Sequence, residues 1–172
     1  MSYAFGHLVG AWGAGKIYGY FSKKKISHAA WFFLLLGGIL PDTDFLLDWT
    51  FGYDTHRTLT HSLLFLMLVP IIVYTLFTIL KHPEKKQFAL FMGLGITTHL
   101  VLDSIFGGGV PLLWPSIVQF SSSGLSFSTL PGSVFSRGNV VELKGQLRSA
   151  IVDMAIGTAW IFYLWFRKRV QF

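Results

Sequence analysis

Several stretches of the chain are long, apolar and almost free of charge, which leaves few folds open to it. The clearest runs from His61 to Leu80 and contains no Asp, Glu, Lys or Arg. A helix needs roughly 20 mostly apolar residues to cross a bilayer. Charged residues make up 13% of the 172 residues, about half the share of an ordinary soluble domain. The sequence therefore predicts an all-α, polytopic transmembrane helical bundle.

Five membrane spans are expected within a single integral membrane domain that covers residues 1–172. The spans are residues 3–21, 28–49, 61–80, 87–106 and 149–166, and residues 107–148 form one long outer loop. Gly and Ala recur in the first span at spacings that allow close helix packing. In the second span, Pro41 removes a backbone donor and is expected to kink or end the helix. Partial alternation from Gly124 to Val141 indicates a small hairpin in the loop.

The basic residues predict how the chain is oriented. Lys and Arg gather in the connections after the first, third and fifth spans, at 23–25, 81–86 and 167–169. Connections with an excess of Lys and Arg face the cytoplasm. We therefore expect the N-terminus outside and the C-terminus in the cytoplasm, in a prokaryotic cytoplasmic membrane. Basic clusters between apolar spans favour membrane lipids as the partner, and not nucleic acid, despite a net charge of +6.

His and Asp residues coincide at the outer face of this topology. The chain has six His and eight Asp or Glu residues. Seven of them are expected at that face: His7, Asp42, Asp44, His56, His61, His99 and Asp103. His99 and Asp103 lie four residues apart, so a helix projects both from one side. His56 is expected in the outer loop and His61 in the first turn of its helix, with Thr60 as the N-cap.

This set of residues predicts a metal site. The chain has no cysteine, which excludes thiolate-based zinc sites and disulfides. Imidazoles and carboxylates without sulfur suit zinc, manganese or iron(II), and we expect zinc, as one or two ions. Asp48 fits either a surface carboxylate or a member of the site. Asp153 lies inside the fifth span, where it is either functional or paired with Arg148 or Arg57.

At these residues the chain resembles the YdjM-like family of membrane-bound metal-dependent hydrolases. The matching features are His7 in a small-residue helix, Pro41–Asp44, the block HRTLTHS at 56–62, His99 with Asp103, and the segment Gly107–Pro115. The resemblance covers about residues 4–115. One departure is Thr58, which stands where the family often has Gly after His-Arg.

The resemblance implies a helical bundle with a metal centre and, by distant analogy, a relation to zinc-dependent phospholipase C-type enzymes. The expected function is metal-dependent hydrolysis of a phosphoester in a lipid or lipid-linked substrate, or transfer of a headgroup. Arg57 is expected either to bind phosphate through two parallel hydrogen bonds or to partner a ligand carboxylate. Asp44 and Asp103 are expected in catalysis, as ligands or as a general base.

Two other functions stay open at this stage. A membrane metalloprotease is disfavoured because the chain has no HExxH motif and no Ser or Cys nucleophile arrangement. A metal transporter or sensor would need ligands distributed through the membrane or a second site at the cytoplasmic face, whereas these candidates gather at one face. The substrate, the metal count and the oligomeric state do not follow from the sequence.

Overall fold

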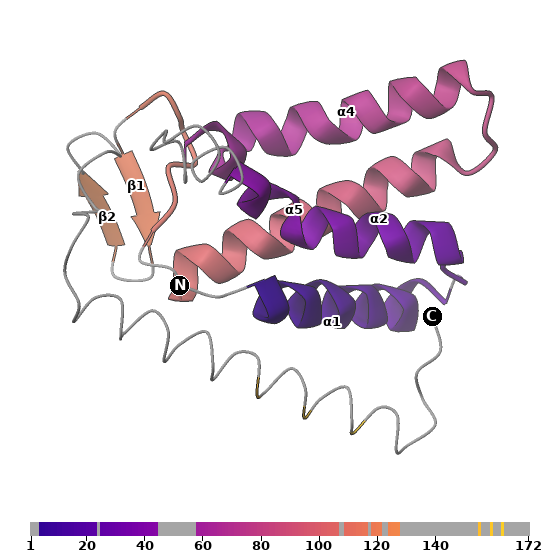
Figure 1. Cartoon of the computed structure of the whole chain (residues 1–172), viewed down its shortest axis with the longest axis horizontal. Coiled ribbons are helices and arrows are strands. Elements are labelled where there is room, and N and C mark those ends of the chain that lie inside the picture. The colour runs from indigo at the N-terminus through magenta and orange to yellow at the C-terminus, as the bar shows by residue number, and fades with distance from the viewer. Residues whose placement is uncertain are drawn as a thin grey trace.

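Within the described residues, the computed structural model contains four α-helices, two short 3-10 turns and one β-hairpin (Figure 1). The helices are α1 (Ala4–Ser22), α2 (His28–Ile39), α4 (Leu63–Ile79) and α5 (Lys85–Phe106). The turns are η1 (Leu40–Thr43) and η2 (Leu59–His61), and the strands are β1 (Val118–Ser121) and β2 (Gly124–Phe127). The structure describes residues 4–23, 25–44, 58–106, 109–116, 118–121 and 124–127, together with 155, 159 and 163.

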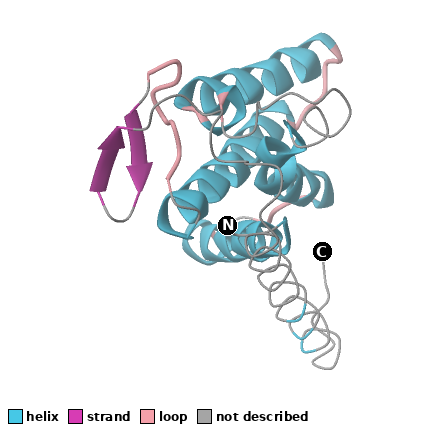
Figure 2. Ribbon diagram, turned by 60° about the vertical axis from the view of Figure 1, so that its left-hand side comes forward, coloured by secondary structure: helices cyan, strands magenta, loops and turns pink. Residues whose placement is uncertain are grey.

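The four helices alternate in direction, so their connections gather at two opposite ends (Figures 1 and 2). The connections from α1 to α2 and from α4 to α5 lie at one end, which we call the lysine end after Lys23, Lys25, Lys81 and Lys85. The turns η1 and η2, the start of α1 and the end of α5 lie at the other end, beside the hairpin. The described part is thus the helical bundle that the sequence predicts.

The predicted break at Pro41 is confirmed. Helix α2 ends at Ile39, and Pro41 stands at the start of η1, where a missing N–H is least harmful. The predicted span 28–49 is therefore not one continuous helix in its described part, which ends at Asp44. The break turns the chain so that η1 presents Asp42 at the end of the bundle.

The N-cap predicted at Thr60 is wrong. Leu59–His61 forms a 3-10 turn, so α4 begins later than expected, at Leu63. Ser62 is the N-cap, because its backbone is extended and its hydroxyl accepts a hydrogen bond from the Phe65 N–H at 3.2 Å. The Thr60 hydroxyl is therefore available for a different partner.

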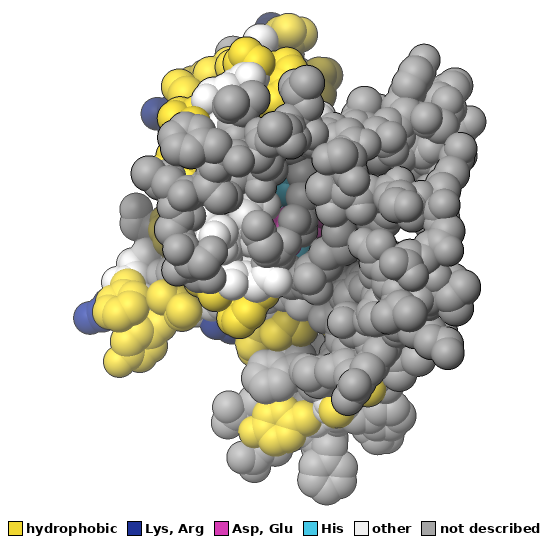
Figure 3. All heavy atoms as spheres, turned by 90° about the vertical axis from the view of Figure 1, so that its left-hand side faces the viewer, with side chains coloured by type: hydrophobic (Ala, Val, Ile, Leu, Met, Phe, Trp, Pro, Cys, Tyr) yellow, Lys and Arg dark blue, Asp and Glu magenta, His cyan; other side chains and the backbone are white. Residues whose placement is uncertain are grey.

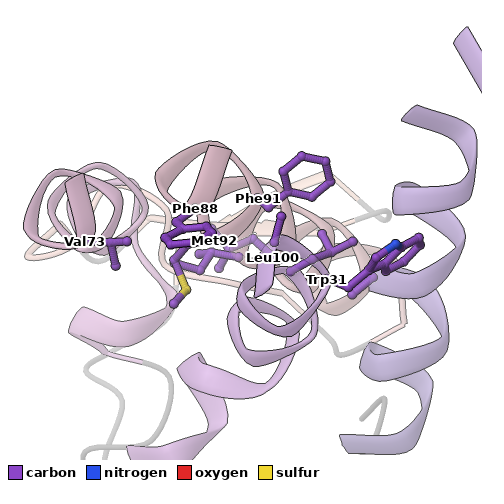
Figure 4. Packing of buried hydrophobic residues seen from close by; sticks show 10 residues of the cluster. Trp31, Val73, Phe88, Phe91, Met92 and Leu100 are labelled. Carbon is purple, nitrogen blue, oxygen red and sulfur yellow. The ribbon is translucent and has the colours of Figure 1, made fainter. Parts of the chain in front are cut away.

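Helices α2 and α5 approach so closely that their crossing requires glycine. A Cβ added to Gly37 would collide with the backbone oxygen of Met92, and one added to Gly95 with that of Leu34. Small residues allow this kind of backbone approach between membrane helices. The core beside the crossing consists of buried apolar side chains, among them Trp31, Phe88, Phe91 and Leu100 (Figure 4).

Among the described helices, α5 is long and apolar enough to cross a bilayer. It has 22 residues, whereas the apolar helix α4 has 17. Helix α4 exposes large apolar side chains that are 44–65% exposed, namely Leu64, Met67, Leu68, Ile71 and Ile72. Helices are described in four of the five predicted spans. The predicted span 149–166 lies outside the described residues except at 155, 159 and 163, which are helical.

The hairpin begins earlier than predicted and adds a small β element to a bundle expected to be all-α. Strand β1 pairs antiparallel with β2, with Val118 opposite Phe127. Residues 128–141 of the predicted hairpin lie outside the described residues. Alternation over the four residues of β1 is too short to stand out in a sequence. The Leu63 N–H donates to the Leu112 oxygen at 2.9 Å, which ties the loop to the start of α4.

Candidate metal centre

Five of the seven predicted ligands meet at the end of the bundle opposite the lysine end, and we call them the His–Asp cluster. They are His7 in α1, Asp42 in η1, His61 in η2, and His99 and Asp103 in α5. The three histidines are fully buried and Asp103 is nearly so, whereas the Asp42 side chain is 18% exposed. Viewed from this end, His and Asp side chains are visible near the middle of the face (Figure 3).

The Nε2 atoms of the three histidines approach the same two carboxylates. His7 Nε2 lies 3.3 Å from Asp103 Oδ1 and 3.9 Å from Asp42 Oδ2. His61 Nε2 lies 3.5 Å from one oxygen of each carboxylate. His99 Nε2 lies 3.5 Å from Asp42 Oδ1 and 4.0 Å from Asp103 Oδ2. The four residues other than His61 each offer one atom within 4.8 Å of the others.

These separations suit ligands around an ion better than hydrogen-bonded pairs. A charge-assisted N–H···O bond is usually about 2.7–2.9 Å long, whereas the shortest of the contacts above is 3.3 Å. Ligands held about 2.1 Å from a tetrahedral zinc ion stand roughly 3.4 Å from one another. Imidazole nitrogen and carboxylate oxygen are also the donors that zinc, manganese and iron accept. The cluster therefore fits a divalent cation in spacing and in chemistry.

The backbone of α2 fixes the orientation of His99. The Gly38 carbonyl oxygen lies 2.8 Å from His99 Nδ1. Because a carbonyl only accepts, Nδ1 carries the proton and Nε2 keeps its lone pair for the cluster. A Cβ added to Gly38 would lie 2.8 Å from the Cβ of Ala11, so this position needs glycine. The ring of His7 stacks on that of His99, with centroids 3.8 Å apart.

Asp44 lies behind His61, on the side of the ring away from the two carboxylates. The Thr60 hydroxyl donates to Asp44 Oδ2 at 2.6 Å, and its oxygen lies 3.0 Å from His61 Nδ1. Since the hydroxyl has one proton, which it donates to Asp44, its oxygen accepts from His61 Nδ1–H. Asp44, predicted as a ligand and a catalytic residue, is placed where it orients a candidate ligand through Thr60.

His61 and His99 face each other through their Nε2 atoms. Their Nε2 atoms lie 3.2 Å apart, and the Nδ1 proton of each ring is engaged elsewhere. Asp42 and Asp103 add further acceptor oxygens at the same place. A cation held among these atoms would be bound by nitrogen and oxygen donors together in a buried environment.

Four residues weighed in the sequence lie outside the described residues: His56, Arg57, Asp48 and Asp153. Two residues that orient the cluster were missed. The signal for Gly38 was the glycine pair that precedes the break at Pro41, and the signal for Thr60 was its position beside His61. Thr58, which stands where the family often has glycine, has a φ of −108° and a ψ of −115°.

Comparison with known proteins confirms the resemblance found in the sequence. The model of the YdjM inner membrane protein family matches residues 1–170. A 64-residue segment is 39% identical to the uncharacterized protein YvsG of Bacillus subtilis (strain 168), and it covers 37% of this chain and 36% of that relative. No solved structure matches the chain. Since the family model spans nearly the whole chain, this protein belongs to the YdjM inner membrane protein family.

Proposed function

We propose that this protein is a membrane-embedded, metal-dependent hydrolase that cleaves a phosphoester of a lipid or lipid-linked substrate at the extracytoplasmic face of the membrane. The observation that carries the proposal is the approach of three buried Nε2 atoms to two carboxylates at spacings that fit a divalent ion. Ionisable groups are costly to bury in a membrane bundle, and where they occur they usually mark a functional site. A metal centre supplies such a function.

The proposed membrane arrangement rests on the two ends of the bundle. The lysine end faces the cytoplasm, because Lys-rich connections do so, and the His–Asp cluster then lies at the outer face. Lipid covers the exposed apolar row that runs from Leu64 to Ile72 on α4. The complete arrangement has five spans, with the N-terminus outside and the C-terminus in the cytoplasm.

A divalent ion bound by the cluster would supply Lewis acidity toward a phosphoryl oxygen and would make an attacking water more acidic. The side chains of the protein have separate tasks around it. Asp42 is the most exposed member of the cluster, so an incoming water or substrate would meet it first. Thr60 holds His61 and the Gly38 carbonyl holds His99, so that both present Nε2. Zinc is the preferred ion, with manganese and iron(II) as alternatives.

Apolar side chains around the cluster favour a lipid substrate. Leu59, Leu63, Phe106 and Leu113 come from η2, the start of α4, the end of α5 and the loop that follows it, and they are 37–65% exposed. Acyl chains can cover such a rim, whereas a water-soluble phosphate ester leaves it exposed. Arg57 is proposed to bind the phosphate group, and it lies outside the described residues.

Headgroup release tests the proposal. Detergent-purified protein is incubated with Zn²⁺ and phospholipids of defined headgroup, and the phosphate-containing products are measured. We expect release by the wild type and at least about 100-fold less by His99→Ala, because a candidate ligand is lost. Thr97→Ala is a matched control on the same helix, since its exposed hydroxyl donates within α5 to Gly93 O at 2.8 Å.

Two outcomes would contradict the proposed hydrolase. One is equal release by the wild type and His99→Ala, which would place the activity elsewhere or in a contaminant. The other is no release from any headgroup tested, combined with rapid Zn²⁺ flux into sealed liposomes, which would indicate a transporter.

A further inference from the structure

Each carboxylate of the cluster directs its two oxygens toward different histidines. Asp103 Oδ1 lies 3.3 Å from His7 Nε2, whereas Asp103 Oδ2 lies 3.5 Å from His61 Nε2. Asp42 divides in the same way, with Oδ2 lying 3.9 Å from His7 Nε2 and Oδ1 lying 3.5 Å from His61 Nε2. Both carboxylates thus direct one oxygen toward His7 and the other toward His61. This arrangement suits carboxylates that each bridge two neighbouring metal positions.

The first position lies among His61 Nε2, His99 Nε2, Asp42 Oδ1 and Asp103 Oδ2. Five distances between these four atoms are 3.2, 3.5, 3.5, 3.5 and 4.0 Å. They lie close to the edge of roughly 3.4 Å that a tetrahedral ion with bonds of about 2.1 Å requires. This position therefore has the four ligands of a closed tetrahedral site.

The second position lies beside His7. Among the described residues, the atoms at this position are His7 Nε2 together with Asp103 Oδ1 and Asp42 Oδ2, which lie 3.3 and 3.9 Å from that nitrogen. Three protein ligands are typical of catalytic zinc, which keeps a coordination position open for water or substrate. Asp42, the most exposed member of the cluster, belongs to this side as well.

We propose that the cluster binds two divalent ions bridged by Asp42 and Asp103: a closed position with His61 and His99, and an open position with His7. The inference rests on the proposed function and specifies its metal centre. In two-metal sites of this kind the ions lie about 3.5–4 Å apart, and one carboxylate can span that separation. The rings of His7 and His99 stack on each other, so the imidazole of one position lies beside the imidazole of the other.

The two positions differ in their dependence on histidine. Loss of His7 removes a ligand from the open position only, so one ion remains. Loss of His61 removes one of the four ligands of the closed position, so the more tightly bound ion is weakened first. Loss of Asp103 removes an oxygen from both positions.

The experiment titrates Mn²⁺ into full-length, detergent-solubilised protein from which metal has been stripped, and it follows stoichiometry and electron paramagnetic resonance. We expect about two equivalents in the wild type, with the exchange-coupled spectrum of neighbouring ions. His7→Ala is expected to bind about one equivalent, with the spectrum of an isolated ion. Thr97→Ala controls for handling, and retained helical circular dichroism shows that His7→Ala remains folded.

Saturation of the wild type at one equivalent would overturn the two-ion centre, as would two equivalents without magnetic coupling. These results do not depend on whether any variant folds. Two coupled ions in a protein that releases no headgroup would support the two-ion centre and contradict the hydrolase. One bound ion in a protein that releases headgroup would contradict the two-ion centre and support the hydrolase.

Discussion

The lysine end and the end that holds the His–Asp cluster use similar polar residues for different purposes. At the lysine end, Ser27 caps α2 by accepting from the Ala30 N–H at 3.2 Å, and it donates to Glu84 Oε2 at 2.9 Å. His82 is only half-buried, and its Nδ1 accepts from the Glu84 N–H at 3.2 Å. The first bond caps α2, the second joins the α1–α2 connection to the α4–α5 connection, and the third lies within the α4–α5 connection.

At the opposite end the polar groups are buried and come from four separate elements. His99 bonds to Gly38, which is 61 positions away in the chain, and its Nε2 meets that of His61, 38 positions away. The second contact brings two imidazole nitrogens together from separate elements. The comparison teaches that polar residues at the lysine end are explained by local structure, whereas the buried cluster gathers groups from distant parts of the chain that could hold a metal ion.

The largest expected effect is that of Asp103→Ala, which removes oxygens that lie near all three histidines of the cluster. We expect Zn²⁺ affinity to fall at least about 1,000-fold, since even outer partners of metal ligands contribute about 10–100-fold. Competition with a chromogenic chelator measures the change. Unchanged Zn²⁺ affinity would contradict a metal-binding role for the cluster and would leave no functional difference between the two ends of the bundle.

Gly95→Ala is expected to come next, because it affects the helix crossing on which the cluster depends. The added methyl group would press on the backbone of α2, and overpacking of this kind costs about 3 kcal/mol. Thermal unfolding followed by circular dichroism measures the loss. Gly13→Ala is the matched control, since nothing lies within 4 Å of the Cβ it would add; equal loss in both variants would contradict the close crossing.

Variants of Thr60 test whether its hydroxyl orients His61 without removing a candidate metal ligand. Thr60→Val keeps the shape but removes the hydroxyl that holds His61 and Asp44. We expect Zn²⁺ affinity to fall about 10–100-fold, with the number of bound ions unchanged. Thr60→Ser keeps the hydroxyl and is expected to bind Zn²⁺ like the wild type. Equal affinity in the Val and Ser variants would show that the hydroxyl does not orient a ligand.

The smallest effect is expected at the lysine end. Ser27→Ala removes the N-cap of α2 and is expected to lower the free energy of unfolding by about 1 kcal/mol, without changing Zn²⁺ affinity. Thermal unfolding and chelator competition measure the two quantities on the same sample. A change in Zn²⁺ affinity would mean that the two ends are coupled through α2.

Periodicity and length in the sequence predict four helices of the fold, and a single residue, Pro41, predicts where α2 ends. The start of α4 was misplaced because Thr60 and Ser62 are both good N-caps, and only the 3-10 turn before Leu63 decides between them. The short strand β1 carries too few residues for its alternation to be recognised. Tertiary contacts, and not local pattern, settle both points.

The members of the cluster could be predicted because Lys and Arg divide the chain into two sides, and His7, Asp42, His61, His99 and Asp103 then share one of them. The role of each member could not be predicted. Asp42 and Asp44 look alike in the sequence, two residues apart. Only the turn of η1 directs Asp42 toward the imidazoles and Asp44 toward Thr60.

Elemental analysis tests most directly whether the buried cluster is a metal centre. Wild type, Asp103→Ala and Ser27→Ala are purified in detergent without chelators, and their transition metals are counted per chain. We expect about two equivalents in the wild type and in Ser27→Ala, and none retained by Asp103→Ala. A wild type without metal, or an Asp103→Ala variant that keeps the full amount, would contradict the metal centre.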